Sequence, residues 1–177
     1  MNIRKLGLAA FFACVFLTLA TGAVAEDRTS PSSRLEKQTE QLNEALRRGN
    51  ESASRLTSQV SGMLDSLRAD DPRLDAAHLR IDTVRYTSDA LQIASVAADK
   101  LLYSLQVYTL IRYQPDRKRI APLLVAMRDS AVREMELGFS AVERLLPRLA
   151  GLTAGDTARD ALREYRAAQD IMRNMKF

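Results

Sequence analysis

The chain has 177 residues, of which 46% are hydrophobic and 27% are charged, and its formal net charge is +4. A chain of this length and composition is long enough to bury one core, so we expect a single domain. The small positive excess argues against a dedicated nucleic-acid-binding protein, which normally carries a larger excess in a basic stripe.

Residues 1–25 have the layout of a secretory signal peptide. Arg4 and Lys5 form a positive start, the run Leu6–Ala20 is almost wholly apolar, and Ala23–Ala25 has the small-x-small pattern of a cleavage site. We therefore expect cleavage after Ala25 and a periplasmic or secreted protein.

Two alternatives remain open for this segment. Leu6–Ala25 is just long enough to span a bilayer and to stay as an inner-membrane anchor. Cys14, the only cysteine, is a candidate for lipid attachment, although Phe11-Phe12-Ala13 is a poor approach to such a site. Cleavage would remove Cys14 and two basic residues, so the mature protein would have no disulfide and a net charge of about +2.

Residues 26–32 are polar and are expected to form a flexible lead-in, followed by a helical domain over residues 33–177. Ser33 stands three residues before Glu36, which is the spacing of a capping box, so the first long helix is expected to begin at Ser33. Gly49 lies in the middle of this helix and predicts a kink or a close helix contact. The inward positions alternate four and three residues apart, as in a coiled coil: Leu35, Thr39, Leu42, Leu46, Gly49, Ala53, Leu56, Val60, Met63 and Leu67.

The second helix is predicted over Pro72–Arg112, with Asp71 as its cap and Pro72 at its first position. The short connection before it makes the first two helices antiparallel neighbours. Its inward positions have the same alternating spacing: Leu74, Ala77, Ile81, Val84, Ser88, Leu91, Ser95, Ala98, Leu102, Leu105 and Thr109.

The third helix is expected after Pro115, starting either at Asp116 with a kink at Pro122 or near Ala121 with Pro122 in its first turn. Pro147 should bend or end it close to Gly151. Its seam positions are Val125, Val132, Met135, Phe139, Val142, Leu146 and Leu149, widened by Leu124, Ala131, Gly138 and Leu145.

A shorter final helix is predicted over residues 156–174, and its end is expected to fray. One side of it carries Ala158, Leu162, Tyr165, Ala168 and Met172. These patterns predict an all-α fold: an elongated antiparallel bundle of about four helices with a long coiled-coil-like N-terminal hairpin. Because the first two helices exceed the last in length, a second copy covering part of the hairpin, in a homodimer, is a further hypothesis.

The strongest local basic cluster lies at the turn between the second and third helices. In an antiparallel bundle, this cluster and the acidic turns fall at opposite ends, so the sequence predicts a charge-polarised molecule. Arginines with nearby tyrosines suit an anionic envelope surface or an acidic partner, or they simply complement a helix dipole and complete the core. The basic cluster is Arg112, Arg117, Lys118 and Arg119, the tyrosines are Tyr103, Tyr108 and Tyr113, and the acidic residues are Asp65, Asp70, Asp71, Asp75, Asp156 and Asp160.

The sequence contains no recognisable catalytic, metal or haem motif. His78 is the only histidine, no Ser-His-Asp set accompanies it, and there is neither a paired-cysteine haem motif nor a Glu-x-x-His pair. A b-type haem between His78 and a methionine such as Met63 is conceivable, but methionines at seam spacing are normally core residues. We therefore predict no cofactor and no metal.

Two classes of function follow from these patterns. The first is an exported, non-enzymatic helical bundle that acts by binding a protein or the envelope surface. The alternative is a small-molecule sensor, or an enzyme of the chorismate mutase type, with a pocket between helices. Such a pocket needs cations that hold carboxylates, and the candidates are Arg80, Arg85, Lys100 and Arg128.

Overall fold

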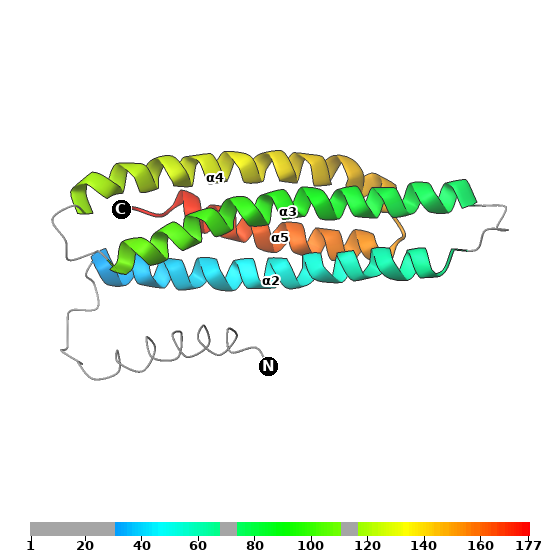
Figure 1. Cartoon of the computed structure of the whole chain (residues 1–177), viewed down its shortest axis with the longest axis horizontal. Coiled ribbons are helices and arrows are strands. Elements are labelled where there is room, and N and C mark those ends of the chain that lie inside the picture. Colours follow the sequence, from blue (N-terminus) through cyan, green and yellow to red (C-terminus); the bar gives the residue numbers. More distant parts are fainter. Residues whose placement is uncertain (1–30, 68–73, 111–116) are drawn as a thin grey trace, which may run out of the picture. The chain divides into compact units, whose positions relative to one another are not determined.

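A computed structural model describes residues 31–67, 74–110 and 117–177. These residues form four α-helices and a short 3₁₀ helix, with no strand among them, and the helices make an all-α bundle (Figure 1). The expected signal segment, the lead-in up to Ser30, the cap at Asp71 with Pro72, and Arg112 all lie outside the described residues. In order, the elements are α2 (Pro31–Asp65), α3 (Leu74–Leu110), α4 (Arg117–Leu145), η2 (Leu146–Leu149) and α5 (Thr153–Arg173).

Polar contacts show that neighbouring helices run antiparallel around the bundle. Along α2 and α3, Asn50 lies opposite Ser95, and Thr57 lies opposite Ser88, further along α2. Similar contacts show that α5 runs antiparallel to α2 and to α4. The most extensive contacts join α2 with α5 and α3 with α4, whereas the sequence pattern had emphasised the α2–α3 pair.

The inward positions predicted for α2, α3 and α5 are buried or half-buried. On α3 the buried face is wider than predicted, because α3 contacts α2, α4 and α5. The side chains form one continuous core. Its largest fully buried members are Leu42, Leu46, Leu56, Leu91, Leu101, Leu105, Tyr108, Met135, Phe139, Leu149, Tyr165 and Met172.

Two glycines allow the helices to approach closely. A Cβ added at Gly49 would lie 2.7 Å from Cε1 of Tyr165, so the close helix contact predicted at Gly49 is confirmed and its partner is α5. A Cβ at Gly138 would lie 2.7 Å from the backbone oxygen of Ala90, which brings α4 against α3. Separations this short require the absence of a side chain.

The observed helix boundaries differ slightly from the predicted ones. α2 begins at Pro31, where the missing N–H has no cost, two residues before the expected cap at Ser33. α4 begins at Arg117 and contains Pro122 within it, which matches the earlier of the two predicted starts. The α-helix ends at Leu145, and Pro147 lies in the first turn of η2, as expected from a proline at this place.

Two predictions about packing are wrong. Val125 is 37% exposed, because the neighbouring Leu124 occupies the inward position on that turn of α4. The end of α5 does not fray: Met175 is fully buried, and its carbonyl accepts a hydrogen bond of 2.8 Å from Nη1 of Arg128. Nε2 of Gln38, on α2, donates a second bond, of 3.2 Å, to the carbonyl of Asn174.

Candidate functional site

The outward side of α3 carries a second series of residues with alternating three- and four-residue spacing. We call this series the α3 outer stripe. Alternation of this kind keeps a row of side chains on one side of a helix and is the spacing used between helices in coiled coils. The stripe consists of Leu79, Asp82, Tyr86, Asp89, Ile93, Val96, Lys100, Tyr103 and Val107.

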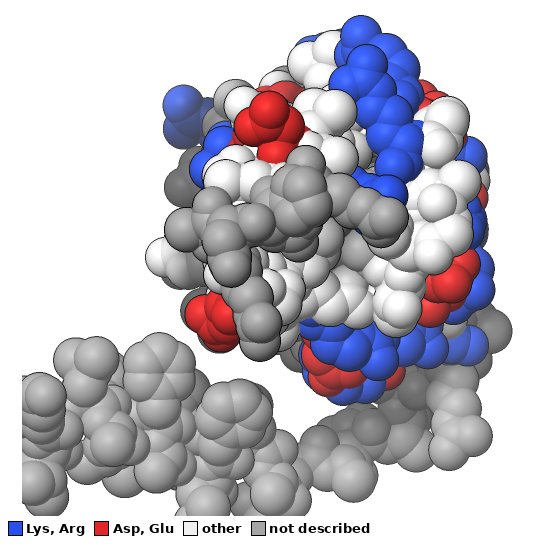
Figure 2. Space-filling model, turned by 90° about the vertical axis from the view of Figure 1, so that its right-hand side faces the viewer, with Lys and Arg blue, Asp and Glu red and all other residues white. Residues whose placement is uncertain are grey.

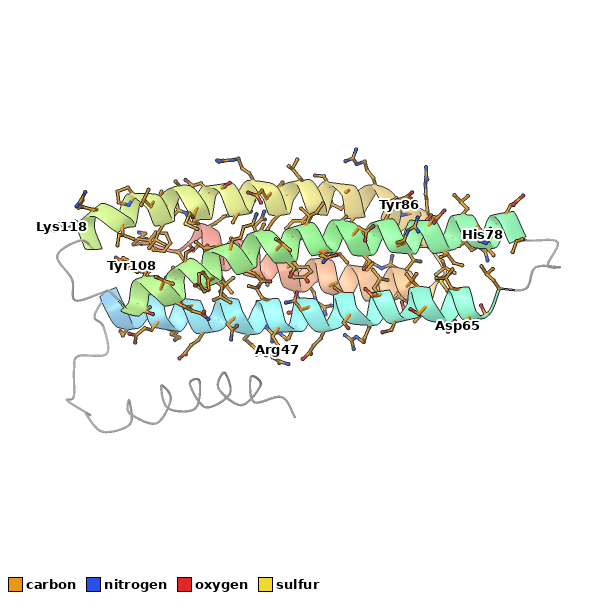
Figure 3. The ribbon with its side chains drawn as sticks, viewed as in Figure 1. Arg47, Asp65, His78, Tyr86, Tyr108 and Lys118 are labelled. Carbon is orange, nitrogen blue, oxygen red and sulfur yellow. The ribbon has the colours of Figure 1, made fainter. Side chains whose placement is uncertain are left out.

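Six of these nine residues are large and apolar, and all six are exposed. Tyr103 is 70% exposed, Ile93 is 53% exposed and Val96 is 46% exposed, whereas Leu91, Ala94 and Ala98 on the inner side are completely buried. Scattered exposed apolar side chains are ordinary, but a row of them along one side of a helix marks a surface that gains free energy when another molecule covers it. Figure 3 shows Tyr86 of this row on α3.

The charged members of the stripe have different surroundings. The carboxylate of Asp82 pairs with Arg85 of the next turn at 2.9 Å, and Nζ of Lys100 lies 3.5 Å from Oε2 of Glu134 on α4. Asp89 is exposed. These charges interrupt the apolar row at defined places, which is how coiled-coil surfaces select the register and orientation of a partner.

Shallow grooves follow the stripe on its α4 side. One, of about 290 Å³, is lined by Asp89, Gln92, Ile93, Val96, Lys100 and Glu134. A smaller one, of about 130 Å³, lies between α3 and α4 and includes Met127 and Glu134. The grooves therefore extend from the stripe onto the near side of α4.

A polar cluster connects α2, α3 and α5 at the level of Asn50. The Tyr165 hydroxyl donates a hydrogen bond of 2.6 Å to Oδ1 of Asn50, and Oγ of Ser95 donates one of 2.7 Å to the same oxygen. Burial raises the pKa of the Tyr165 phenol to about 12. Burial also raises the pKa of the Asp99 carboxyl, against the lowering effect of a hydrogen bond from Ser95. The cluster satisfies a buried phenol and fixes the register of three helices.

The four cations considered for small-ligand binding do not meet in one pocket. Arg80 and Arg85 are exposed near the start of α3, and Lys100 is exposed beside Glu134. Arg128, on α4, is half-buried against the residues that follow α5, where it lies over the ring of Phe177 and pairs with its neighbour Asp129 at 2.8 Å. The structure therefore places these residues at separate positions along the bundle.

The basic cluster between the second and third helices is only partly described. Arg112 lies outside the described residues, and so does the side chain of Arg117. Lys118 and Arg119 are exposed in the first turn of α4, and Figure 3 shows Lys118 there. Tyr113 is also outside the described part, and the other two tyrosines point in different directions, since Tyr108 is 2% exposed and Tyr103 belongs to the outer stripe.

The predicted acidic end is described only in part, because Asp70 and Asp71 lie outside the described residues. Asp156 pairs with Arg159 at 2.8 Å, and Asp160 pairs with Arg163 at 3.2 Å. Figure 2, which views the bundle from the end of α2, shows basic side chains beside acidic ones there. These two acidic residues are each balanced by an arginine one turn away on the same helix.

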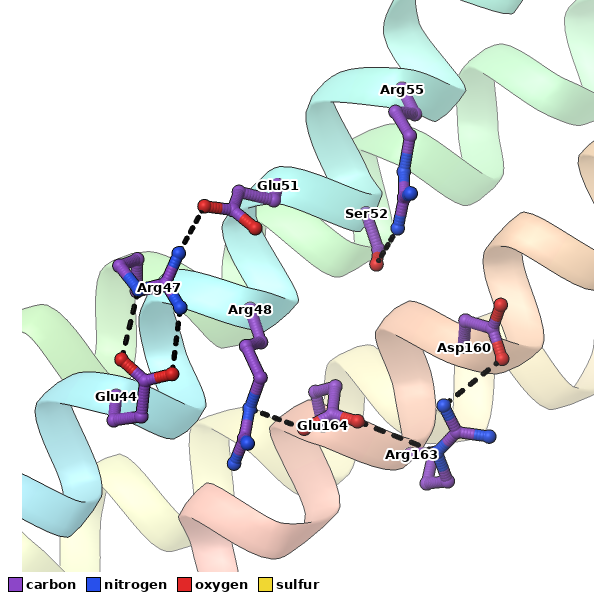
Figure 4. Close-up of polar contacts among 9 residues, drawn as sticks. All are labelled: Glu44, Arg47, Arg48, Glu51, Ser52, Arg55, Asp160, Arg163 and Glu164. Atoms are coloured by element: carbon purple, nitrogen blue, oxygen red, sulfur yellow. Dashed lines mark hydrogen bonds and ion pairs between the residues drawn. The ribbon is translucent and has the colours of Figure 1, made fainter.

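Exposed ion pairs also cover the surface where α2 and α5 lie side by side (Figure 4). Arg48 Nε on α2 lies 3.1 Å from Oε2 of Glu164 on α5. Arg47 bonds both Glu44 and Glu51, and its hydrogen bond lowers the pKa of Glu44. Because solvent screens such pairs, they contribute little to stability.

The chemistry-bearing groups that the sequence singled out are not assembled into a centre. His78 is exposed on α3 (Figure 3). The described ranges contain no group of three or more histidine, cysteine or acidic residues placed to hold a metal ion. Within the same ranges, no helix combines the length and the apolar character needed to cross a bilayer.

The α3 outer stripe was not predicted, because the spacing was used only to assign the inward residues of this helix. The signal was present: a second set of apolar residues with the same spacing, displaced from the first by about half a turn of the helix. Ile93 is no larger than the leucines that are buried on the inner side beside alanines, and Tyr86 and Tyr103 are no larger than the buried Tyr108, so size alone does not separate the two series. Comparison of the chain with protein-family models, curated proteins and solved structures finds no match.

Proposed function

We propose that this chain is an exported, non-catalytic helical-bundle protein that acts by binding a helical protein segment along the α3 outer stripe. The observation that carries the proposal is the row of six exposed large apolar side chains on one coiled-coil-like series. Burial of such a row contributes about 25 cal/mol for each Å² of apolar surface removed from water. The free energy available for association therefore lies on this side of the bundle.

A helix is the partner that matches the spacing of this surface. From Leu79 to Val107 the stripe extends over about 42 Å, at 1.5 Å per residue. A partner helix with apolar residues at the same spacing would pack its side chains between those of the stripe, whereas a compact ligand would cover only one or two turns. The shallow grooves beside Ile93 and Lys100 leave room at the edge of the row.

Site-specific photo-crosslinking in living cells tests this function. A benzoylphenylalanine at Tyr103, on the stripe, is expected to give a defined protein adduct, identified by mass spectrometry. The same group at Ala167, which is exposed on α5, is the matched control and is expected to give none. Equal labelling at both positions, or no adduct at Tyr103, contradicts the proposal.

Export rests on the residues at the start of the chain. The positive Arg4 and Lys5, the apolar run and the Ala23–Ala25 pattern support removal of the first 25 residues. Intact mass measurement on the protein from the periplasmic fraction or the medium is expected to give a chain beginning at Glu26. A full-length chain recovered from the inner membrane would instead support the retained anchor Leu6–Ala25.

Envelope-surface binding through the basic cluster Arg112, Arg117, Lys118 and Arg119 stays a separate prediction. Each basic residue near an anionic surface contributes about 1 kcal/mol. Co-sedimentation with anionic vesicles is expected to fall when Arg117, Lys118 and Arg119 are replaced by glutamate. Unchanged sedimentation would exclude this mode and leave protein binding through the stripe.

A further inference from the structure

We infer that the α3 outer stripe binds the same stripe of a second copy of this chain, with the two α3 helices antiparallel. The inference rests on the proposed function and names its partner. It is carried by the order of residues along the stripe, which is self-complementary about a point midway between Ile93 and Val96.

Antiparallel pairing about this point matches apolar residues with apolar residues. Ile93 lies opposite the partner's Val96 at the centre, and Tyr86 lies opposite the partner's Tyr103 further out. The two-fold axis repeats each pair, so four apolar layers form from one sequence. Layers that pair an a position of one helix with a d position of the other are typical of antiparallel coiled coils. In an interface with two-fold symmetry, each contact between two residues also occurs with the two chains exchanged.

The same pairing also matches the charges. Asp89 falls opposite the partner's Lys100, and the symmetry gives this opposite-charge pair twice. In a parallel arrangement with the same register, Asp89 would face the partner's Asp89, and Lys100 would face the partner's Lys100. Like charges in facing seam positions disfavour association, so the charges select the antiparallel orientation.

The contacts within each chain define where the interface is strongest. Lys100 already lies 3.5 Å from Glu134, so in the dimer it is placed between Glu134 and the partner's Asp89. Beyond Tyr86 and Tyr103 the match weakens, since Val107 falls opposite the partner's Asp82. The closest contact is therefore expected over the segment from Tyr86 to Tyr103.

Charge reversal tests the pairing in the purified protein. Sedimentation equilibrium is expected to show a dimer whose dissociation constant rises at least about tenfold in Asp89→Lys, because two attractive pairs become repulsive. In the double variant Asp89→Lys/Lys100→Asp, the pairs are restored with exchanged signs, and the dissociation constant is expected to return to within about threefold of the parent value. Glu40→Lys, an equal charge change at an exposed position on α2, is the control and is expected to leave it unchanged.

Disulfide trapping tests the orientation in a Cys14→Ser background. The double variant Tyr86→Cys/Tyr103→Cys is expected to form disulfide-linked dimers on mild oxidation. Each single variant is expected to stay unlinked. In the antiparallel pair, the two copies of the same cysteine are displaced by 17 residues along the helices, which is about 25 Å and too far for a disulfide. Dimers trapped by either single cysteine would indicate a parallel pair and overturn the inference.

Other outcomes separate this inference from the proposed function. The side chains substituted on α2 and α3 are exposed, and circular dichroism with thermal melting verifies that each variant is folded. A protein that stays monomeric at 100 µM by sedimentation overturns the self-association. If Tyr103 then crosslinks to a different protein in cells, the proposed function stands while the second copy is excluded as its partner.

Discussion

The inner and outer sides of α3 carry residues at the same alternating spacing, yet their surroundings are opposite. On the inner side, Ala94 and Ala98 let the neighbouring helices approach, and Leu91 fills the space between them. On the outer side, Ile93 and Tyr103 are large and exposed, and no described part of the chain covers them. Spacing therefore tells which residues share a side of a helix, whereas contact with the other helices decides which of two apolar sides is buried.

The largest expected effect is the loss of a buried side chain from the core, which is compared with the loss of an exposed apolar side chain on the same helix. Phe139 is fully buried, so Phe139→Ala is expected to lower the free energy of unfolding by about 3–5 kcal/mol. Leu137, two residues earlier on α4, is 70% exposed, and Leu137→Ala is expected to stay within about 0.5 kcal/mol of the parent. Chemical denaturation of the two variants measures both values. Similar losses would mean that Leu137 is covered in solution.

A smaller effect is expected where a glycine sets the distance between helices. The Cβ of Gly138→Ala would meet the backbone oxygen of Ala90, which cannot move away easily, so a loss of about 1–3 kcal/mol is expected. A Cβ at Gly62 meets nothing within 4 Å, and Gly62→Ala is expected to stabilise α2 by about 0.5–1 kcal/mol. Thermal and urea unfolding compare the pair. Stabilisation by both substitutions would show that α3 and α4 are further apart than described.

The smallest effect concerns the polar cluster around Asn50. Tyr165→Phe removes the bond to Asn50 and is expected to cost about 1 kcal/mol at pH 7.

This difference should depend on pH. The pKa of Tyr165 rises from 10.0 to about 12 on folding, so its contribution is complete below pH 10 and is lost between pH 10 and pH 12. Urea unfolding at pH 8 and at pH 11 is therefore expected to show a smaller difference between parent and variant at the higher pH. A difference that does not change would contradict burial of the phenol.

Much of the fold was predictable because helical spacing and proline positions act locally. The buried series on α2 and α5, the role of Gly49 and the end of α4 before Pro147 all follow from the sequence order. The burial of Leu124 instead of Val125 does not follow from the sequence order. Both residues are apolar, and only the packing of α4 against the other helices decides which of them is buried. The partners of Met175 and Arg128 likewise depend on which distant segments meet.

The candidate site was less predictable for a related reason. Cations such as Arg80 and Lys100 are candidates because of their charge. Whether such side chains meet in one pocket depends on where they lie in the folded bundle. The outer stripe is visible in the sequence as a second series on the same helix with the same spacing, in which Tyr86 and Tyr103 are large apolar members.

The pairing of α2 with α5 also determines the order in which the bundle can be completed. Among the described helices, α2 is synthesised first and α5 last, so the main partner of α2 does not exist until nearly the whole chain has been made. Gln38 precedes Asn174 by 136 residues, and Asn50, next to Gly49, precedes Tyr165 by 115, so these contacts form only after that length of chain has been added. Contacts this distant in sequence slow folding. The unpaired apolar side of α2 is therefore the part of the newly made chain that most needs protection from aggregation before the final helix arrives.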